Sequence, residues 1–203
     1  MKKIFALVIL LLISCGGGGE RQGEIVQKEE TTTIVRSVLM VIAHRDFRDK
    51  EFKEPYDIFT KSGMKVVVAS TDTTPARGMS GMIVKPDINL AGVNTKDYDG
   101  IVIVGGDGCR ILWDNKTLHE IVRSFNADKK MVAAICIAPM VLANAGILED
   151  KIVTAYPSVR DEIGKCCAKC TDSDIEVSGN IITCSEPKAA ADFAKTIIGA
   201  MNQ

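Results

Sequence analysis

Cys136 stands where a run of small apolar residues meets a proline, in the stretch "AAICIAPMVLANAG". A nucleophile elbow needs a strand, one strained residue and an immediate helix, with small residues two positions before and after the nucleophile. Ala134 and Ala138 occupy those positions, and Pro139 can begin the helix because the first turn does not need its N–H. The dipole of that helix would favour the thiolate and lower the pKa of Cys136. The spacing leaves two interpretations: a nucleophilic thiol, or a structural cysteine packed like a small hydrophobic residue.

The segment "VGGDG" follows a second apolar run and contains the adjacent glycines Gly105 and Gly106. Glycine exposes its backbone N–H without obstruction by a side chain, which suits an oxyanion hole. The expected donors are the N–H of Gly106 and the N–H of Ile137, directly after the nucleophile. The alternative is a plain turn or a phosphate loop. The sequence contains no G-x-G-x-x-G or G-K-[ST] motif, so nothing in it favours a nucleotide site.

Three further side chains could carry protons near such a thiol. Glu51, in "FRDKEFKEP", lies near the start of an expected helix. Its carboxyl group could position a thiol and, when protonated, donate to the thiolate; the alternative is a solvated glutamate at a helix end. His44 follows the first expected strand and is either a proton shuttle or a structural histidine. His119 lies in a helical pattern, where we expect it on the surface.

Alternating strands and helices must position these residues. Apolar runs at 35–43, 65–70, 100–104 and 131–135 are typical of strands buried on both faces. Helical spacing of apolar residues lies between them and again near the C-terminus, and a late hairpin is expected from 175–177 and 181–184. The pattern predicts an α/β fold: a flavodoxin/Rossmann-like three-layer sandwich, with a mostly parallel sheet, helices on both faces and a nucleophile elbow. The loops at 44–51, 105–109 and 136–139 would meet at the carboxyl ends of the strands.

Length and composition are consistent with one folded domain. The chain has 203 residues, of which 46% are hydrophobic, so it can bury a sizeable core and is not of a disordered type. Charged residues make up 25%, and the net charge is −1. This balance gives no indication of a nucleic-acid partner.

The N-terminus has the pattern of an export signal. Lys2 and Lys3 precede an apolar run at 4–13, which is too short for a membrane-spanning helix of ~20 residues. The stretch "LLISCG" resembles a bacterial lipobox, in which Cys15 would become the lipidated first residue; the alternative is an ordinary signal cleaved nearby. We therefore expect a signal peptide at 1–14, a lipidated Cys15 with a flexible tether at 15–33, and a folded domain at 34–203. The protein would be exported and lipid-anchored to a bacterial membrane, facing the periplasm or the cell exterior, and would contact the membrane only through the anchor.

Six further cysteines would then lie outside the cytoplasm, where disulfides can persist. Cys166, Cys167 and Cys170 form the cluster "CCAKC", and Cys109 and Cys184 lie elsewhere in the chain. A disulfide within the cluster or to Cys109 is one interpretation, and a resolving thiol for Cys136 is another. No second C-x-x-C or histidine pair lies nearby to complete a zinc site, so no metal is expected.

Four stretches carry a resemblance to a known family. They are "YDGIVIVGG", "AAICIAP…LANAGIL", "TAYP" and "IITCSEPKAAADFA", in that order. From about residue 35 to the C-terminus the chain resembles the ThiJ/PfpI superfamily, the family of the Parkinsonism-associated deglycase, and the wider class I glutamine-amidotransferase-like fold. The resemblance implies that Cys136 is the elbow cysteine, that Glu51 donates to it, and that Gly106 and Ile137 supply oxyanion amides, with Gly105 and Tyr156 beside the substrate. It also implies a homodimer, no cofactor, and a small reactive carbonyl or acyl substrate.

The chain departs from that family at three positions. Ile137 stands where the protease-like branch carries histidine, which weakens a cysteine-peptidase function because no adjacent imidazole can take the thiol proton. Tyr156 stands where human-type members have histidine, and Ser185 where arginine is frequent. The resemblance implies cofactor-free glyoxalase or deglycase chemistry, or a related hydrolase, at Cys136, and the residues themselves favour a reactive thiol without choosing a substrate. The alternatives are a redox sensor or stress-protective protein in which Cys136 oxidises without turnover, and a chaperone.

Overall fold

The structure is a computed structural model that describes residues 35–202. The expected signal peptide, Cys15 and the tether lie outside the described residues. Within residues 35–202, none of the helices has the length and apolar character needed to cross a membrane.

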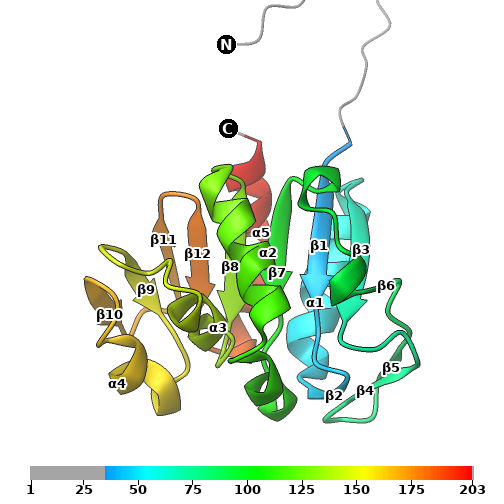
Figure 1. The fold of residues 1–203 in the computed structure, drawn as a ribbon, viewed down its shortest axis with the longest axis horizontal. Helices are drawn as coiled ribbons and strands as arrows, with labels where there is room; N and C mark the ends of the chain where they lie inside the picture. Colours follow the sequence, from blue (N-terminus) through cyan, green and yellow to red (C-terminus); the bar gives the residue numbers. More distant parts are fainter. Residues whose placement is uncertain (1–34, 203) are drawn as a thin grey trace, which may run out of the picture. The chain divides into compact units, whose positions relative to one another are not determined.

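A seven-stranded sheet forms the centre of the domain (Figure 1), in the order β11-β12-β8-β7-β1-β3-β6. Neighbouring strands are parallel except for β11 and β12, which form the expected antiparallel hairpin. The strands, in chain order, are β1 (Ser37–Val41), β3 (Lys65–Ser70), β6 (Ile88–Asn89), β7 (Gly100–Ile103), β8 (Met131–Ile135), β11 (Ile175–Ser178) and β12 (Ile181–Cys184).

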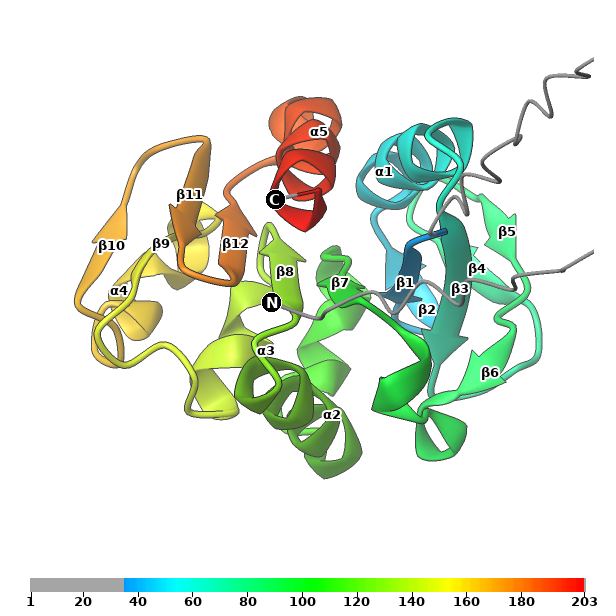
Figure 2. The same cartoon turned by 90° about the horizontal axis from the view of Figure 1, so that it is seen from above.

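Helices cover both faces of this sheet. Seen from above, α1 (Asp49–Lys61) and α5 (Ala190–Met201) lie on one side, and α2 (Lys116–Ala127) and α3 (Pro139–Asn144) lie on the other (Figure 2). The three-layer α/β fold predicted from the alternation of apolar patterns is therefore confirmed. Each long helix turns an aromatic side chain into the core, namely Phe59, Phe125 and Phe193, and all three are fully buried. Burying such a side chain stabilises the fold by about 1.5–3 kcal/mol.

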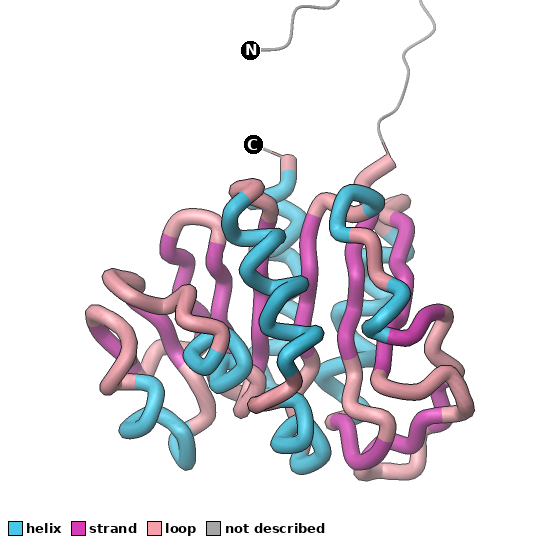
Figure 3. The backbone as a smooth tube through the Cα atoms, in the orientation of Figure 1, coloured by secondary structure: helices cyan, strands magenta, loops and turns pink. Residues whose placement is uncertain are grey.

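Two smaller sheets flank the central one (Figure 3). One contains β2 (Arg45–Phe47), β4 (Ala76–Gly78) and β5 (Ile83–Val84). The other contains β9 (Ile152–Thr154) and β10 (Lys169–Thr171), and the short helix α4 (Arg160–Ile163) lies between these two strands in the chain. The sequence pattern does not predict these strands. Each has only two or three residues, which is too short for an alternating pattern to stand out.

The strands β1, β7 and β8 are buried along their whole length, as their continuous apolar runs predict. Because they are parallel neighbours, the loops that follow them emerge at one edge of the sheet, the lower edge in Figure 1. The described chain begins and ends at the opposite edge, where β1 starts and α5 stops. The loops expected to carry the chemistry therefore share one edge of the domain.

Candidate active site

Cys136 occupies a strained turn between β8 and α3. Its φ angle is +66°, in the left-handed region that a residue other than glycine rarely adopts and that costs on the order of 1–3 kcal/mol. Its N–H donates to the carbonyl of Cys184 at 2.8 Å, and its carbonyl accepts the N–H of Tyr156 at 2.9 Å. Ala134 and Ala138, two residues to either side, are fully buried. The elbow predicted from these small residues is present, and hydrogen bonds on both sides hold its backbone.

Glu51 reaches the elbow from the first turn of α1. Its side chain is fully buried, and its Oε2 accepts the N–H of Gly105 at 3.0 Å. A Cβ atom at Gly105 would lie 2.6 Å from that oxygen and 2.7 Å from the Cβ of Cys136, so only glycine fits between the two side chains. The solvated glutamate that the sequence left open is therefore excluded.

Arg48, just before α1, also lies in the site, although it is not among the residues expected from the sequence. Its Nε lies 3.5 Å from Oε1 of Glu51, and neither atom has a hydrogen-bond partner in the described chain. The backbone N–H of Arg48 donates to the carbonyl of Gly105 at 3.0 Å, so the loops before α1 and after β7 are tied together. The i,i+3 spacing of Arg48 and Glu51 was the available signal, since residues three apart share a helix face.

The surroundings of Glu51 bring the pKa of its carboxyl group close to neutral pH. Burial raises the pKa of its carboxyl group from 4.5 to about 7. The contact with Cys136, the positive charge of Arg48 and the N–H of Gly105 all act in the opposite direction. The carboxyl group is therefore divided between its protonated and ionised forms near pH 7, which suits a group that takes and returns protons.

The pKa of Cys136 is raised to about 12, mainly by burial and next by the negative charge of Glu51. The expectation of a lowered thiol pKa is wrong for this state, because α3 is only six residues long and the sulfur is almost out of contact with water. The N–H groups of Gly106 and Ile137 hydrogen-bond to the sulfur and favour its thiolate. Part of the opposing effect disappears when Glu51 is protonated, since the repelling charge is then gone.

The two expected oxyanion donors, Gly106 and Ile137, both reach the sulfur of Cys136. Gly106 has a φ of +98°, and a Cβ there would lie 2.6 Å from the carbonyl oxygen of Asp46. Only glycine suits this position, because the backbone conformation is one that other residues rarely adopt and because a side chain would collide with the backbone. The N–H of Gly105 donates to Glu51, so in this structure Gly105 positions the carboxyl group.

The remaining sequence candidates lie around this centre. Tyr156 binds the elbow through its backbone, and its side chain is partly exposed. His44 has Thr74 as its partner, with Nε2 3.4 Å from Oγ1, and it lines a hollow of about 530 Å³ that also includes Asp72. Within the described chain no hydrogen bond or ion pair joins His44 to Cys136 or Glu51. His119 was expected on the surface but is buried, with Nε2 2.7 Å from the carbonyl oxygen of Trp113.

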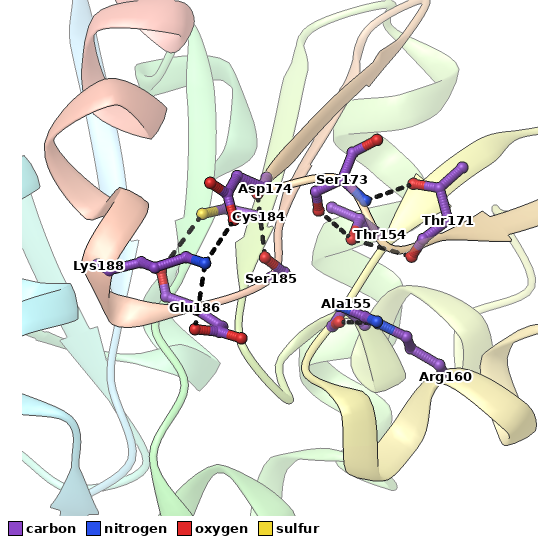
Figure 4. A network of polar contacts seen from close by, with 10 residues as sticks. All are labelled: Thr154, Ala155, Arg160, Thr171, Ser173, Asp174, Cys184, Ser185, Glu186 and Lys188. Atoms are coloured by element: carbon purple, nitrogen blue, oxygen red, sulfur yellow. Dashed lines mark hydrogen bonds and ion pairs between the residues drawn. The ribbon is translucent and has the colours of Figure 1, made fainter.

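A polar network supports the loop after β12 (Figure 4). The N–H of Ser185 donates to the carbonyl of Asp174 at 2.9 Å, and the ammonium of Lys188 lies 3.1 Å from the carboxylate of Asp174. The Cys184 thiol donates to the carbonyl of Glu186 at 3.7 Å. Ser185 is buried within this network. Its role is to fix the strand end whose Cys184 carbonyl receives the N–H of Cys136.

All six cysteines of the described chain are free thiols. Cys109, Cys136 and Cys184 are buried, and Cys166, Cys167 and Cys170 lie at or near the surface. Between residues 35 and 202, no group of three or more His, Cys, Asp and Glu side chains is arranged to hold a metal ion.

The model of the DJ-1/PfpI family matches residues 36–200, which include Cys136, Glu51, Gly106 and Ile137. The chain belongs to the DJ-1/PfpI family. The family resemblance seen in the sequence motifs is thereby confirmed.

Some of the relatives that this chain matches are named as enzymes. An uncharacterized protein of Methanocaldococcus jannaschii is 42% identical over 170 residues, 82% of this chain and 83% of that protein. A glutathione-independent glyoxalase of Caenorhabditis elegans is 29% identical over 163 residues, 80% and 87% of the two chains. A deglycase of Pyrococcus horikoshii is 30% identical over 151 residues, 74% and 90% of the two chains.

Solved structures show the same fold. The crystal structure of a ThiJ/PfpI domain protein from Brachyspira murdochii superimposes with a TM-score of 0.80 at 32% identity. The match covers 83% of this chain and 97% of that one. The flavodoxin-like arrangement of sheet and helices is thus shared with an experimentally determined relative.

Proposed function

We propose that the protein is an enzyme in which Cys136 attacks small reactive carbonyl compounds, as a cofactor-free glyoxalase or deglycase. The observation that carries the proposal is the arrangement at the elbow: a cysteine at positive φ faces a buried carboxyl group and two backbone N–H donors. The names of the nematode and archaeal relatives support the same reaction class.

The first step would transfer the thiol proton of Cys136 to the carboxylate of Glu51. This leaves one negative charge in the site before and after the transfer, so no additional charge is buried. Protonated Glu51 then donates toward the thiolate instead of repelling it, and the Gly106 and Ile137 N–H groups stabilise the sulfur. This route reaches a reactive thiolate in spite of the high pKa of Cys136.

The thiolate would next form a C–S bond with the aldehyde carbon of a 2-oxoaldehyde such as methylglyoxal. The carbonyl oxygen takes up the negative charge, and the N–H groups of Gly106 and Ile137 are suited to bind it. Glu51 returns its proton to this oxygen, giving a hemithioacetal. Glu51 then carries the C–H proton of the first carbon to the second, and the hydroxyl proton on the first carbon passes to the ketone oxygen on the second, which gives a thioester of lactate. Water hydrolyses this thioester to lactate and free Cys136.

The test is lactate formation from methylglyoxal by the wild-type chain and by Cys136→Ala and Cys136→Ser. Both variants should lose conversion, because neither alanine nor an unactivated hydroxyl replaces the thiolate. Cys166→Ser, which removes an exposed thiol, is the matched control and should remain active. Conversion by Cys136→Ala at the wild-type rate would refute the proposal.

A redox-sensing function has support from the same geometry. The two N–H donors and a carboxyl group with a pKa near 7 would also stabilise the oxygens of a sulfinate at Cys136. Mild peroxide treatment followed by peptide mass analysis separates the two functions. Clean sulfinate formation at Cys136, together with no lactate from methylglyoxal, would favour the sensor.

Export, lipid anchoring through Cys15 and homodimer formation are further proposals, and the first two rest on the sequence pattern alone. In this proposal residues 1–14 are removed and the domain at 34–203 is held outside the cytoplasm by a tether. The dimer is inferred from the family and is checked by the sedimentation of the purified protein. A monomer at micromolar concentration would contradict it.

A further inference from the structure

The cysteines 166, 167 and 170, here called the thiol cluster, take no part in the site around Cys136. They lie in the segment between α4 and β10, with Cys170 inside β10. Cys166 is exposed, and Cys167 and Cys170 are half-buried. In the described chain these three thiols are the most exposed ones, because Cys109, Cys136 and Cys184 are buried.

Accessibility decides which thiols react with a large disulfide reagent. Cys109 and Cys184 are fully buried, so a large reagent cannot reach either sulfur. The thiol cluster borders two surface hollows. Cys166 and Cys167 line one of about 390 Å³, and Cys170 lines another of about 750 Å³. The second hollow is bordered by three basic side chains and by three acidic ones, so its formal charges balance; they are Arg160, Lys165 and Lys169, and Asp161, Asp172 and Glu176.

The contacts of each thiol indicate which two can pair. The Cys166 thiol points back to α4 and donates to the carbonyl of Ile163 at 3.2 Å. The N–H of Lys169, the residue directly before Cys170, donates to the carbonyl of Lys151 at 3.3 Å and also lies close enough to the Cys167 sulfur to favour its thiolate. Cys167 and Cys170 also both pack against the edge of the hydrophobic core. Of the other two thiols, Cys167 has the larger electrostatic effect on Cys170, so Cys167 is the nearer partner and Cys166 the more distant one.

A bridge between the adjacent Cys166 and Cys167 is disfavoured on geometric grounds. It would close a ring of eight atoms that includes a peptide bond, which forces the disulfide away from its preferred dihedral angle. Residues 166–168 form a bend before β10 begins, and this bend brings the chain around between Cys167 and Cys170. The C-x-x-C spacing is therefore the one that closes without such distortion.

We propose that Cys167 and Cys170 form a redox-active pair that small-molecule disulfides of the glutathione class oxidise to an intramolecular disulfide. One of the two thiolates attacks the external disulfide, forms a mixed disulfide and releases one small thiol. The second thiolate attacks the protein sulfur of the mixed disulfide and releases the other small thiol. The protein loses two electrons and two protons, and the reagent is reduced to two thiols.

The pair lies on a segment that leads directly to the elbow. Cys170 pairs with Val153 in the β9–β10 ladder, and the chain between these strands contains Tyr156, whose N–H binds the carbonyl of Cys136. Arg160 braces the same crossover by donating to the carbonyl of Ala155 at 2.7 Å. A disulfide would join the end of this crossover to β10 and restrict the segment that supports the elbow.

Trypsin provides a direct test, because Lys169 lies between the two cysteines. The full chain is reduced, freed of reductant, incubated with oxidised glutathione, quenched in acid, alkylated in denaturant and digested. Cleavage after Lys165, Lys169 and Lys188 separates residues 166–169 from residues 170–188. We expect these two peptides to be joined by one disulfide, with Cys166 and Cys184 alkylated, and to separate after reduction.

Serine variants assign the bridge. Cys166→Ser should keep the linked peptides, whereas Cys167→Ser and Cys170→Ser should each abolish the link and retain glutathione on the remaining thiol. Circular dichroism of each variant confirms the fold. A disulfide within residues 166–169, a link that survives in Cys167→Ser, or three unmodified thiols after incubation would each overturn the proposal. None of these readouts depends on turnover of methylglyoxal.

Discussion

The Nε atom of Arg48 lies 3.5 Å from Oε1 of Glu51, and within the described chain neither atom has any hydrogen-bond partner. Oε2 of the same carboxyl group is bound to the N–H of Gly105. One oxygen of Glu51 is thus held by a backbone donor and the other faces a cation whose side chain is 38% exposed. Arg48 therefore stabilises the ionised form of a carboxyl group that burial would otherwise keep protonated.

Replacing Arg48 with glutamine should move the pH dependence of catalysis upward. The groups that face Glu51 are Arg48, the thiol of Cys136, and the buried thiols of Cys109 and Cys184. Of these Arg48 alone carries a positive charge, so its loss raises the pKa of Glu51. The limb of the kcat/KM profile that requires ionised Glu51 should shift to higher pH, measured by lactate formation between pH 5 and 9.

Arg48→Lys is the matched variant for this prediction. It keeps the positive charge and should leave the profile closer to that of the wild type, although lysine is a point charge without the planar guanidinium. If Arg48→Gln lowers activity equally at every pH, then Arg48 has only a structural part in the site.

Replacing Glu51 with glutamine should separate thiol reactivity from turnover. An amide can still donate a hydrogen bond to the Cys136 sulfur, so Cys136 should remain open to alkylation. It cannot carry a proton, and conversion of methylglyoxal should fall by ~10²–10⁴-fold, the usual contribution of general acid–base catalysis. The two effects are compared on one preparation: mass spectrometry measures the alkylation rate of Cys136, and the lactate assay measures turnover. Simultaneous loss of both, with an altered circular dichroism spectrum, would indicate structural damage instead.

The sequence predicted the strands and the turn that position the site better than it predicted the burial and the pKa values of the site residues. The continuous apolar runs gave β1, β3, β7 and β8, and the small residues around Cys136 gave the elbow, because both patterns follow from local packing. The burial of Glu51 could not be read from its position near a helix end. It depends on Gly105, which lies more than fifty residues away and leaves room for the carboxyl group.

Two predictions from the sequence, for His119 and for Cys136, were wrong because burial cannot be read from local sequence. His119 was expected at the surface, yet its side chain is buried and its Nε2 lies 2.7 Å from the carbonyl oxygen of Trp113. Cys136 was expected to have a low pKa from its place before a helix. Burial and the charge of Glu51 outweigh the short α3 helix, and neither is visible in local sequence. Local patterns predict elements well, but they do not give the distance of a group from water.

Replacing Gly105 with alanine should damage the site. The added Cβ would meet Oε2 of Glu51 at 2.6 Å and Cβ of Cys136 at 2.7 Å, and both neighbours are buried and held by hydrogen bonds. We expect the free energy of unfolding to fall by about 1–3 kcal/mol, as for other overpacked cores, and conversion of methylglyoxal to be lost. Chemical denaturation and the lactate assay measure the two effects.

Gly199→Ala is the control for that substitution. Gly199 lies in α5, and a Cβ there would meet nothing within 4 Å. Alanine should therefore raise the free energy of unfolding by up to about 1 kcal/mol, because it favours the helix. A Gly105→Ala protein as stable and active as Gly199→Ala would contradict the tight packing between Glu51 and Cys136.

Lipid anchoring predicts a defined modification at Cys15. The wild-type chain, produced in a bacterium that lipidates exported proteins, should yield an N-terminal peptide that begins at Cys15 and carries the mass of the lipid. Cys15→Ser should accumulate as the unlipidated precursor, while Cys166→Ser should be lipidated normally. Wild-type protein without lipid on Cys15 would show that the pattern at 1–14 has another role.

The raised pKa of Glu51 also predicts a pH-dependent stability. The folded protein holds this proton with a pKa of about 7, against the ordinary glutamate value of 4.5, so it binds the proton more tightly than the unfolded chain does. The resulting stabilisation is fully present below about pH 4.5 and is lost as the pH rises through 7. The difference corresponds to roughly 3 kcal/mol at most, from 1.36 kcal/mol per pKa unit.

Glu51→Gln should remove this dependence, because glutamine is neutral at every pH. Its free energy of unfolding, relative to wild type, should therefore increase between pH 4.5 and 7.5, as measured by urea denaturation at each pH. Glu54→Gln is the matched control in the same helix. Glu54 forms only a surface ion pair with Lys50 at 3.7 Å, so its loss should change stability by less than about 1 kcal/mol. A constant difference between Glu51→Gln and wild type across this range would mean that the carboxyl group ionises in the folded protein as easily as in water, and Glu51 could not then be the proton carrier of the site.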